Sequence, residues 1–303
     1  AEMAAHRQRW RWLLGAVLLV ATAIALFGLV RYHAGSRMML FGEERHPSYE
    51  MRLGGTYNCP NHFANLVEML IPFAWVLLWM PAAGWFWRLV AGYSLLVFLP
   101  AMLLSQSRSG WIGTAVGLTV ATGALAVRRN WKWFLLFLLL APLLLAAVGW
   151  ALWSGSDIFR ERVQQALAGN IRYGLWQDTW SLIQYQPWWG FGAGSYRWVF
   201  PPFRTITQQM YFNYAHNEYL HLLADYGAVG LGLGALAFSW AALRGLVLLW
   251  RVPPGREAGL IAGLLGCVAA ALAHALFDFN FHIFANNHVL LLCAGTVAGV
   301  LFQ

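Results

Sequence analysis

Long apolar runs separated by short polar segments dominate the pattern of this chain. A helix needs about 20 mainly apolar residues to cross a bilayer, so runs near that length indicate membrane spans. Eight such runs follow one another: 13–30, 63–80, 85–104, 110–127, 133–153, 228–250, 258–277 and 287–302. The pattern predicts an all-α polytopic membrane protein with about eight transmembrane helices.

One polar stretch, residues 154–227, interrupts the apolar runs for much longer than a connector requires. A loop of this length is usually functional or disordered, and its many Trp, Tyr and Phe residues argue against disorder. We therefore expect a large, ordered, helical loop outside the membrane that carries the chemistry. The chain divides accordingly into N-terminal transmembrane helices with a loop at 31–62 (residues 1–104) and a second unit (residues 105–303) that includes the large loop.

Composition agrees with a membrane protein: 60% of the residues are hydrophobic and 11% are charged, whereas soluble proteins average about 25% charged residues. The formal net charge is +8, and we expect membrane lipids, not nucleic acid, as partners. The three cysteines show no CxxC spacing, which indicates neither a disulfide framework nor a metal site. The sequence also contains no Walker, HExxH or GxSxG motif, and no Asp-x-Asp pair to hold a divalent metal.

Basic residues beside the spans set the predicted orientation, because Arg and Lys concentrate in short cytoplasmic turns. The turn at 128–132 is one of the short segments in which they crowd. We predict that both termini are cytoplasmic. Four polar segments then share the outer face: 31–62, 105–109, 154–227 and 278–286.

Three side chains on that face are candidates for chemistry. Arg108 stands at the outer end of two apolar runs, where an arginine is costly unless it snorkels, pairs or faces a polar cavity. Arg172 lies in a predicted amphipathic helix, and a guanidinium can hold phosphate oxygens bidentately. His216 can accept a proton from a hydroxyl. An interfacial anchor, a solvated arginine and a structural histidine are the alternatives, and from the residues alone the last two are favoured.

Two further groups of polar or flexible residues lie on the same face. Gly190 and Gly192 belong to a glycine-rich run that could form a backbone nest for an anion. Asn58, Asn61 and His62 form a polar cap before a span, which a helix start alone would also explain.

The last outer segment contains His274 and Asp278, four residues apart on one predicted helix face. Two ligands are too few for a zinc site. We therefore expect these residues to form an Asp–His pair or the wall of a polar cavity.

The order of these elements resembles that of the O-antigen ligase and polymerase family. A run from Ser105 to Trp111 opens a span as the family's domain does, and Arg172-x-x-x-Trp176, residues 187–192 and residues 215–220 follow in the family's order. Residues 55–64 resemble a segment upstream of the domain, and residues 274–280 resemble a late one. Members usually have more spans, so the resemblance also implies that N-terminal helices are missing from this chain.

The resemblance implies a metal-independent glycosyltransferase of the bacterial inner membrane, with no cofactor. It would move a glycan from undecaprenyl diphosphate to an acceptor hydroxyl on the periplasmic face. Arg108 and Arg172 would hold the diphosphate, and His216 would activate the acceptor hydroxyl. The implied substrate-binding residues are Asn58, Asn61, His62, Trp176, Gly190, Gly192, Asn217, Glu218, Asp278 and Asn280.

Three alternatives stay open at this point. The first hypothesis is an O-antigen ligase with a lipid A-core acceptor; a polymerase and a protein O-oligosaccharyltransferase of the same family are the first two alternatives. A flippase or transporter of polyprenyl-linked saccharides is the alternative from another class. It predicts ionisable groups near mid-membrane, of which Glu68 in the second run is the main example.

Overall fold

A computed structural model describes the chain at residues 2–36, 38–49, 51–129, 132, 150, 154–155, 157, 160, 171–206 and 212–300. Within these ranges every regular element is a helix, apart from one isolated bridge between Met38 and Glu44. The expectation of an all-α polytopic membrane protein is confirmed.

Six helices of the described residues are long and apolar enough to cross a membrane. They are α1 (Glu2–His33), α2 (Pro60–Trp79), α3 (Trp85–Ser105), α4 (Arg108–Arg129), α9 (Glu218–Arg251) and α10 (Arg256–Ala275). The predicted run at 133–153 falls almost entirely outside the described residues. The described residues of the run at 287–302 are helical: α11 (Phe284–Gly295) continues into a π-helical turn, Thr296–Val300, although the described helix is shorter than a span requires.

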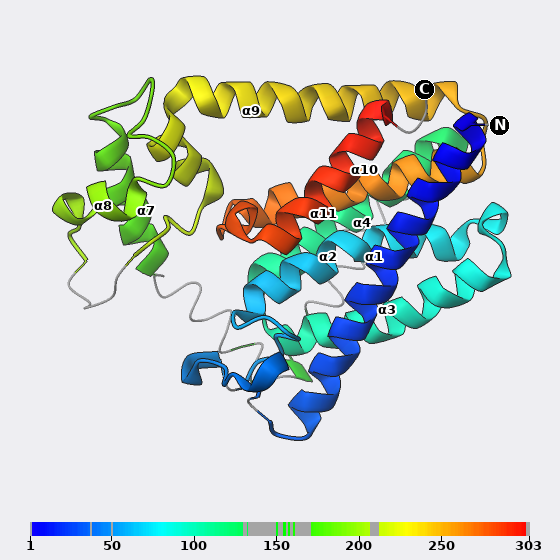
Figure 1. The fold of residues 1–303 in the computed structure, drawn as a ribbon, viewed down its shortest axis with the longest axis horizontal. Helices are drawn as coiled ribbons and strands as arrows, with labels where there is room; N and C mark the ends of the chain where they lie inside the picture. The colour runs from blue at the N-terminus through cyan, green and yellow to red at the C-terminus, as the bar shows by residue number, and fades with distance from the viewer. Residues whose placement is uncertain are drawn as a thin grey trace.

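Helices α2 and α10 form the centre of the helical bundle, and α4 packs against both (Figure 1). The close crossing of α4 and α10 depends on two glycines. A Cβ on Gly117 would lie 2.8 Å from the Gly266 carbonyl oxygen, and a Cβ on Gly266 would lie 2.6 Å from the Gly117 carbonyl oxygen. Neither backbone can move away without opening the bundle, so small residues permit this contact.

A smaller body, which we call the head, consists of residues 171–206 and 212–227. It contains α7 (Ile171–Ile183), α8 (Tyr196–Val199) and the first turns of α9, and it lies at one end of the bundle (Figure 1). Its own core is apolar and is formed by Leu175, Leu182, Ile183, Tyr196, Phe200, Ala215 and Ala224. The large loop is therefore ordered over its described part, as the aromatic content predicts.

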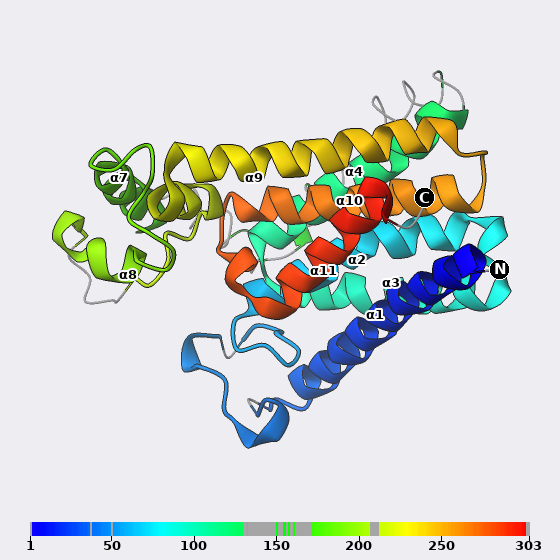
Figure 2. The same ribbon diagram turned by 45° about the horizontal axis from the view of Figure 1, so that its top comes forward.

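Helix α9 changes direction where it leaves the head. Gly227 has φ 65° and ψ −173° inside α9, a conformation that glycine adopts without steric cost. The backbone of Trp188 and Trp189 lies against its Cα, where a side chain would collide. The kink thus separates the head portion of α9 from the long apolar portion that runs along the bundle (Figure 2).

The four polar segments predicted to share one face meet at one end of the bundle. Arg52 donates to the Ser105 carbonyl oxygen at 2.8 Å, which joins the first loop to the α3–α4 turn. Asn61 donates to Asp278 at 2.9 Å, and Arg172 of the head donates to the Phe277 carbonyl oxygen at 2.6 Å. The α2–α3 and α9–α10 turns lie at the opposite end (Figure 1).

Candidate functional site

The carboxylate of Asp278 is the centre of the polar network at that end. Asp278 lies between α10 and α11, and its side chain is 1% exposed. Its Oδ1 contacts His216 Nδ1 at 3.2 Å and accepts from the Phe279 N–H at 3.0 Å. Its Oδ2 accepts from Asn61 at 2.9 Å and lies 3.6 Å from Arg172 Nη2. Both carboxylate oxygens therefore face donors from other parts of the chain.

These donors keep Asp278 ionised. Burial raises the pKa of its carboxyl, but the His216 hydrogen bond and the positive charges of Arg172 and His216 outweigh burial. The net result is a pKa well below the usual range. Asp278 is a fixed negative charge at neutral pH.

His216 stands in an unusual backbone position just before α9. Its φ is 49°, in the left-handed region that residues other than glycine seldom adopt. The next residue, Asn217, accepts the Leu220 N–H at 3.1 Å and so caps α9. The ring of Phe279 lies edge-on to the His216 ring, with centroids 4.9 Å apart. Cap and ring together direct the imidazole toward Asp278.

The contact with Asp278 determines which nitrogen of His216 can act as a base. An ionised carboxylate only accepts hydrogen bonds, so Nδ1 carries the proton that faces Asp278. The lone pair then lies on Nε2, and the side chain is 33% exposed. This is the orientation in which a carboxylate supports a histidine as general base.

Arg108 and Arg172 line one cavity next to this pair. The cavity has a volume of about 150 Å³, and its other lining residues are Ser109, Ile112, Tyr173, Trp176 and Phe277. Arg108 is the first residue of α4 and Arg172 the second of α7, so the two guanidinium groups come from distant parts of the chain. Trp176 donates to the Ala215 carbonyl oxygen at 3.1 Å, which links the cavity wall to the segment bearing His216.

A buried polar chain extends from the cavity into the bundle. Ser109 Oγ lies 2.9 Å from His274 Nε2, and His274 Nδ1 lies 2.9 Å from both carboxylate oxygens of Glu68. Asn65 donates to Glu68 at 2.7 Å. The expected pairing of His274 with Asp278 is wrong, because α10 ends at Ala275 and the carboxylate of Asp278 lies against His216 instead.

The polar cap before α2 divides into residues inside and outside the site. Asn61 joins the site, because it links Asp278 to Arg52, whose Nη2 lies 2.6 Å from Asn61 Oδ1. His62 packs its ring on Phe279 with centroids 4.8 Å apart. Asn58 is exposed and accepts the His46 N–H at 3.0 Å, so its contact is within the loop.

The glycine-rich run of the head has its N–H groups directed at protein acceptors. The N–H of Gly190 donates to Gln186, that of Gly192 donates to the Asp225 carbonyl oxygen, and that of Gly194 donates to the Asp225 carboxylate at 2.7 Å. A Cβ on Gly190 would lie 2.5 Å from the Asp225 backbone. The run therefore packs against α9, and these donors are not available to a substrate anion in this conformation.

Two residues predicted to bind substrate, Glu218 and Asn280, lie behind the cavity and do not line it. Glu218 is buried, with its Oε1 2.9 Å from His282 Nδ1. Asn280 is 2% exposed, and neither its Oδ1 nor its Nδ2 has a hydrogen-bond partner.

Sequence reasoning missed four members of the network: Arg52, Ser109, His282 and the pairing of Glu68 with His274. Arg52 lies in an irregular loop, and no motif distinguishes it from other arginines of the chain. A buried Glu in the middle of a span was a signal that a partner was needed, but it did not say which.

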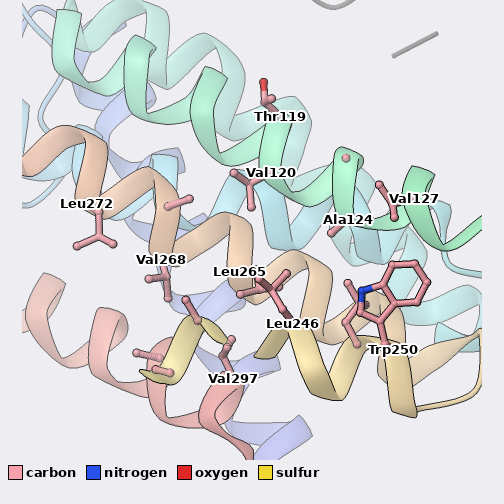
Figure 3. A pocket seen from close by; sticks show the side chains of 16 residues that line it. Thr119, Val120, Ala124, Val127, Leu246, Trp250, Leu265, Val268, Leu272 and Val297 are labelled. Atoms are coloured by element: carbon pink, nitrogen blue, oxygen red, sulfur yellow. The ribbon is translucent and has the colours of Figure 1, made fainter. Parts of the chain in front are cut away.

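A larger cavity lies elsewhere and is apolar. It has a volume of about 500 Å³ and lies between α4, α9, α10 and the C-terminal turn (Figure 3). Leu246, Trp250, Leu265 and Val297 are among the side chains that line it. Because no acid, base or cation lines it, we place the chemistry at the smaller polar cavity.

Comparison with known proteins identifies a family for part of the chain. Residues 93–235 match the family model described as O-Antigen ligase, whereas no curated protein matches the chain. The matched range contains Arg108, Arg172 and His216; Asp278 and Asn61 lie beyond it and are brought to the same place by the fold. The family implies an enzyme of the ligase or glycosyltransferase type. Residues 93–235 therefore form a domain of the O-antigen ligase family, which supports the predicted resemblance to the O-antigen ligase and polymerase family.

Proposed function

We propose that this protein transfers a glycan from undecaprenyl diphosphate to an acceptor hydroxyl. One observation carries the proposal: two arginines line a cavity beside a histidine that a buried carboxylate orients. The arginines suit the diphosphate of the donor, and the histidine suits the acceptor hydroxyl.

The diphosphate leaving group requires positive charge at the cavity. Arg108 and Arg172 remain protonated at any physiological pH and can each bind two phosphate oxygens. Arg172 is held in place by the Phe277 carbonyl oxygen and by Asp278. Guanidinium groups that are fixed before the reaction stabilise the charge that develops on the leaving oxygen. In this proposal the arginines do the work that a divalent metal does in other transferases.

The transfer step forms one bond, breaks one bond and moves one proton. The acceptor oxygen forms a bond to the anomeric carbon of the glycan while its proton passes to His216 Nε2. The bond from that carbon to the diphosphate oxygen breaks, and undecaprenyl diphosphate departs with the bonding electrons. The imidazolium that forms on His216 is stabilised by Asp278, 3.2 Å away.

The positions of the cavity and of the basic turns suggest a place for the reaction. The cavity lies at the head end of the bundle, and the short turns at the other end carry basic residues such as Arg128 and Arg251. The positive-inside rule then assigns the head end to the periplasm of a bacterial inner membrane. The lipid-linked donor would reach the cavity laterally from the outer leaflet.

The acceptor distinguishes the members of the family. We propose a lipid A-core acceptor, which makes the enzyme an O-antigen ligase. Transfer to the end of a second lipid-linked glycan would instead indicate a polymerase, and transfer to a protein serine or threonine would indicate an O-oligosaccharyltransferase.

The test is release of undecaprenyl diphosphate from a lipid-linked glycan by the purified full-length protein in detergent. Wild type would be compared with His216→Ala and Arg172→Lys, with each of the three acceptor classes. We expect release that depends on the lipid A-core acceptor and falls by at least about 100-fold in both variants. Arg204→Lys is the matched control, because Arg204 donates within the head at Ile206 and does not line the cavity.

Two outcomes would count against the proposal. Turnover that survives both substitutions would show that the site lies elsewhere. Saturable binding of the lipid-linked glycan without release, for every acceptor, would favour a flippase.

A further inference from the structure

We propose that a divalent transition metal of the zinc type binds where the head meets the bundle, at His221, Asp225 and His282 with Glu218 beside them. The site is structural and lies behind the cavity. It takes no part in the transfer step described above.

Two elements supply the ligands. His221 and Asp225 stand four residues apart on the first turns of α9 and so share one helix face. Glu218 begins the same helix. His282 comes from η5 (Asn280–His282), the short turn between α10 and α11. The long apolar portion of α9 and all of α10 separate His282 from the other three in the sequence, which is why no ligand spacing is visible there.

The ligand atoms are close enough for a single ion. One ligand atom each from His221, Asp225 and His282 lie within 4.8 Å of one another. A point equidistant from three atoms at that spacing is at most about 2.8 Å from each, and zinc requires about 2.1 Å. Each ligand would therefore move inward by at most about 0.7 Å, which side-chain rotation can supply. Glu218 Oε1 lies 2.9 Å from His282 Nδ1, next to this set of three, and would become the fourth ligand by a further rotation of its side chain.

Buried oxygens without hydrogen-bond partners point independently to a bound cation. Among the described residues, Glu218 Oε2 and Asp225 Oδ1 are buried and have none, whereas Glu218 Oε1 lies 2.9 Å from His282 Nδ1. The two residues are 0% and 1% exposed. The other oxygen of Asp225 already accepts the Gly194 N–H at 2.7 Å, which holds the carboxylate in place and leaves Oδ1 for the cation. An uncompensated buried carboxylate oxygen is costly, so a partner is expected.

The donor set selects the class of metal. Two imidazoles and two carboxylates favour a zinc-type ion over calcium or magnesium, which prefer oxygen ligands alone. A doubly charged cation also neutralises the two carboxylates when both imidazoles are neutral. Binding through His221 Nε2, which faces Asp225 at 3.5 Å, puts the ring proton on Nδ1. The long 3.4 Å contact from the Ala215 N–H to Nδ1 is then given up.

The metal would brace the two chain segments that build the candidate site. Three contacts join the segment from Tyr214 to Asp225 to the segment from Phe277 to His282. His216 meets Asp278, the Tyr214 ring stacks on Phe279 with centroids 4.1 Å apart, and Glu218 meets His282. A cation bound beside Glu218 and His282 would hold the two segments in the alignment that the His216–Asp278 and Tyr214–Phe279 contacts require. The head is thereby attached to the bundle.

The test measures metal content and stability, neither of which needs turnover. The full-length protein would be purified without a histidine tag, and its zinc content measured by mass spectrometry. Metal-free protein would then be titrated with Co²⁺, whose visible absorption reports tetrahedral nitrogen and oxygen ligands. We expect one metal ion per chain, and an unfolding temperature that rises with added Zn²⁺.

Three variants decide the question. His282→Gln removes a ligand that is partly exposed, so the protein should still fold, and metal affinity should fall by at least about 100-fold. His282→Cys keeps a zinc ligand and should restore binding. His288→Gln changes an exposed histidine on α11 and should leave binding unchanged. Wild-type protein that folds but holds no more Zn²⁺ or Co²⁺ than His282→Gln would overturn the proposal, because the cluster would then consist of ion pairs alone.

Discussion

Replacement of Asp278 by asparagine is the sharpest test of the network around His216. The carboxylate offers one oxygen to His216 and the Phe279 N–H, and the other to Asn61 and Arg172. An amide has only one oxygen. Whichever way the new side chain turns, its NH₂ group faces two donors that have lost their acceptor, and the negative charge is gone.

The magnitude follows from distance and burial. Opposite unit charges about 4 Å apart contribute about 4 kcal/mol at an effective dielectric constant of 20. Because His216 is 33% exposed, water screens part of this interaction. We take about 3 kcal/mol for the lost stabilisation of the imidazolium, which corresponds to a turnover about 10²-fold slower. The buried donors left without an acceptor should in addition lower the free energy of unfolding by about 3 kcal/mol.

The assay is single-turnover release of undecaprenyl diphosphate, measured well below the unfolding temperature of the variant so that loss of fold does not contribute. The matched control is Asp157→Asn, the same change at a side chain that is 83% exposed. A folded Asp278→Asn variant that keeps more than about a third of wild-type turnover would refute the role given to this carboxylate.

Three further predictions test the network and the bundle. The unfolding temperatures of wild type and Asp278→Asn should differ fully at pH 7 and converge as the pH falls below about 4, because the pKa of Asp278 is lowered in the folded state and its contribution is lost when it protonates. A gap that stays constant down to the lowest tolerated pH would contradict this. Glu68→Gln should weaken the chain to Ser109 and lower the unfolding temperature, whereas Glu43→Gln, the same change at an exposed glutamate, should not; equal shifts would show that the chain is dispensable. Gly117→Leu should destabilise the fold by at least about 2 kcal/mol, because its Cβ alone would lie 2.8 Å from the Gly266 carbonyl oxygen, whereas Gly232→Leu, where no atom lies within 4 Å, should be tolerated. The stability of both glycine variants can be measured by thermal unfolding, with the loss of folded protein monitored by size-exclusion chromatography.

Much of the fold could be predicted from local pattern. The length of each apolar run predicts a span because the bilayer thickness and the rise per residue of a helix are both fixed. The helix that contains Arg172 was predicted from its amphipathic pattern, whereas Arg108 was placed in a polar turn and is instead the first residue of α4. The change from α-helix to π-helix after Gly295 was not visible, because the apolar pattern continues past that residue without a break.

The candidate site depends on contacts between helices that no local pattern specifies. His274 and Asp278 were expected to pair because they are four residues apart, but the helix ends between them and each finds a partner more than 60 residues away. The same holds for His221 and His282, which come from different elements.

The sequence by itself therefore determined the placement of the six spans found in the described residues, the ordered head and the order of motifs that resembles the family. Which donors meet at Asp278, and which ligands meet at His282, was decided only in the tertiary structure. The physical reason is that periodicity specifies the face of one helix, whereas the shift of one helix along another depends on close contacts such as Gly117 against Gly266.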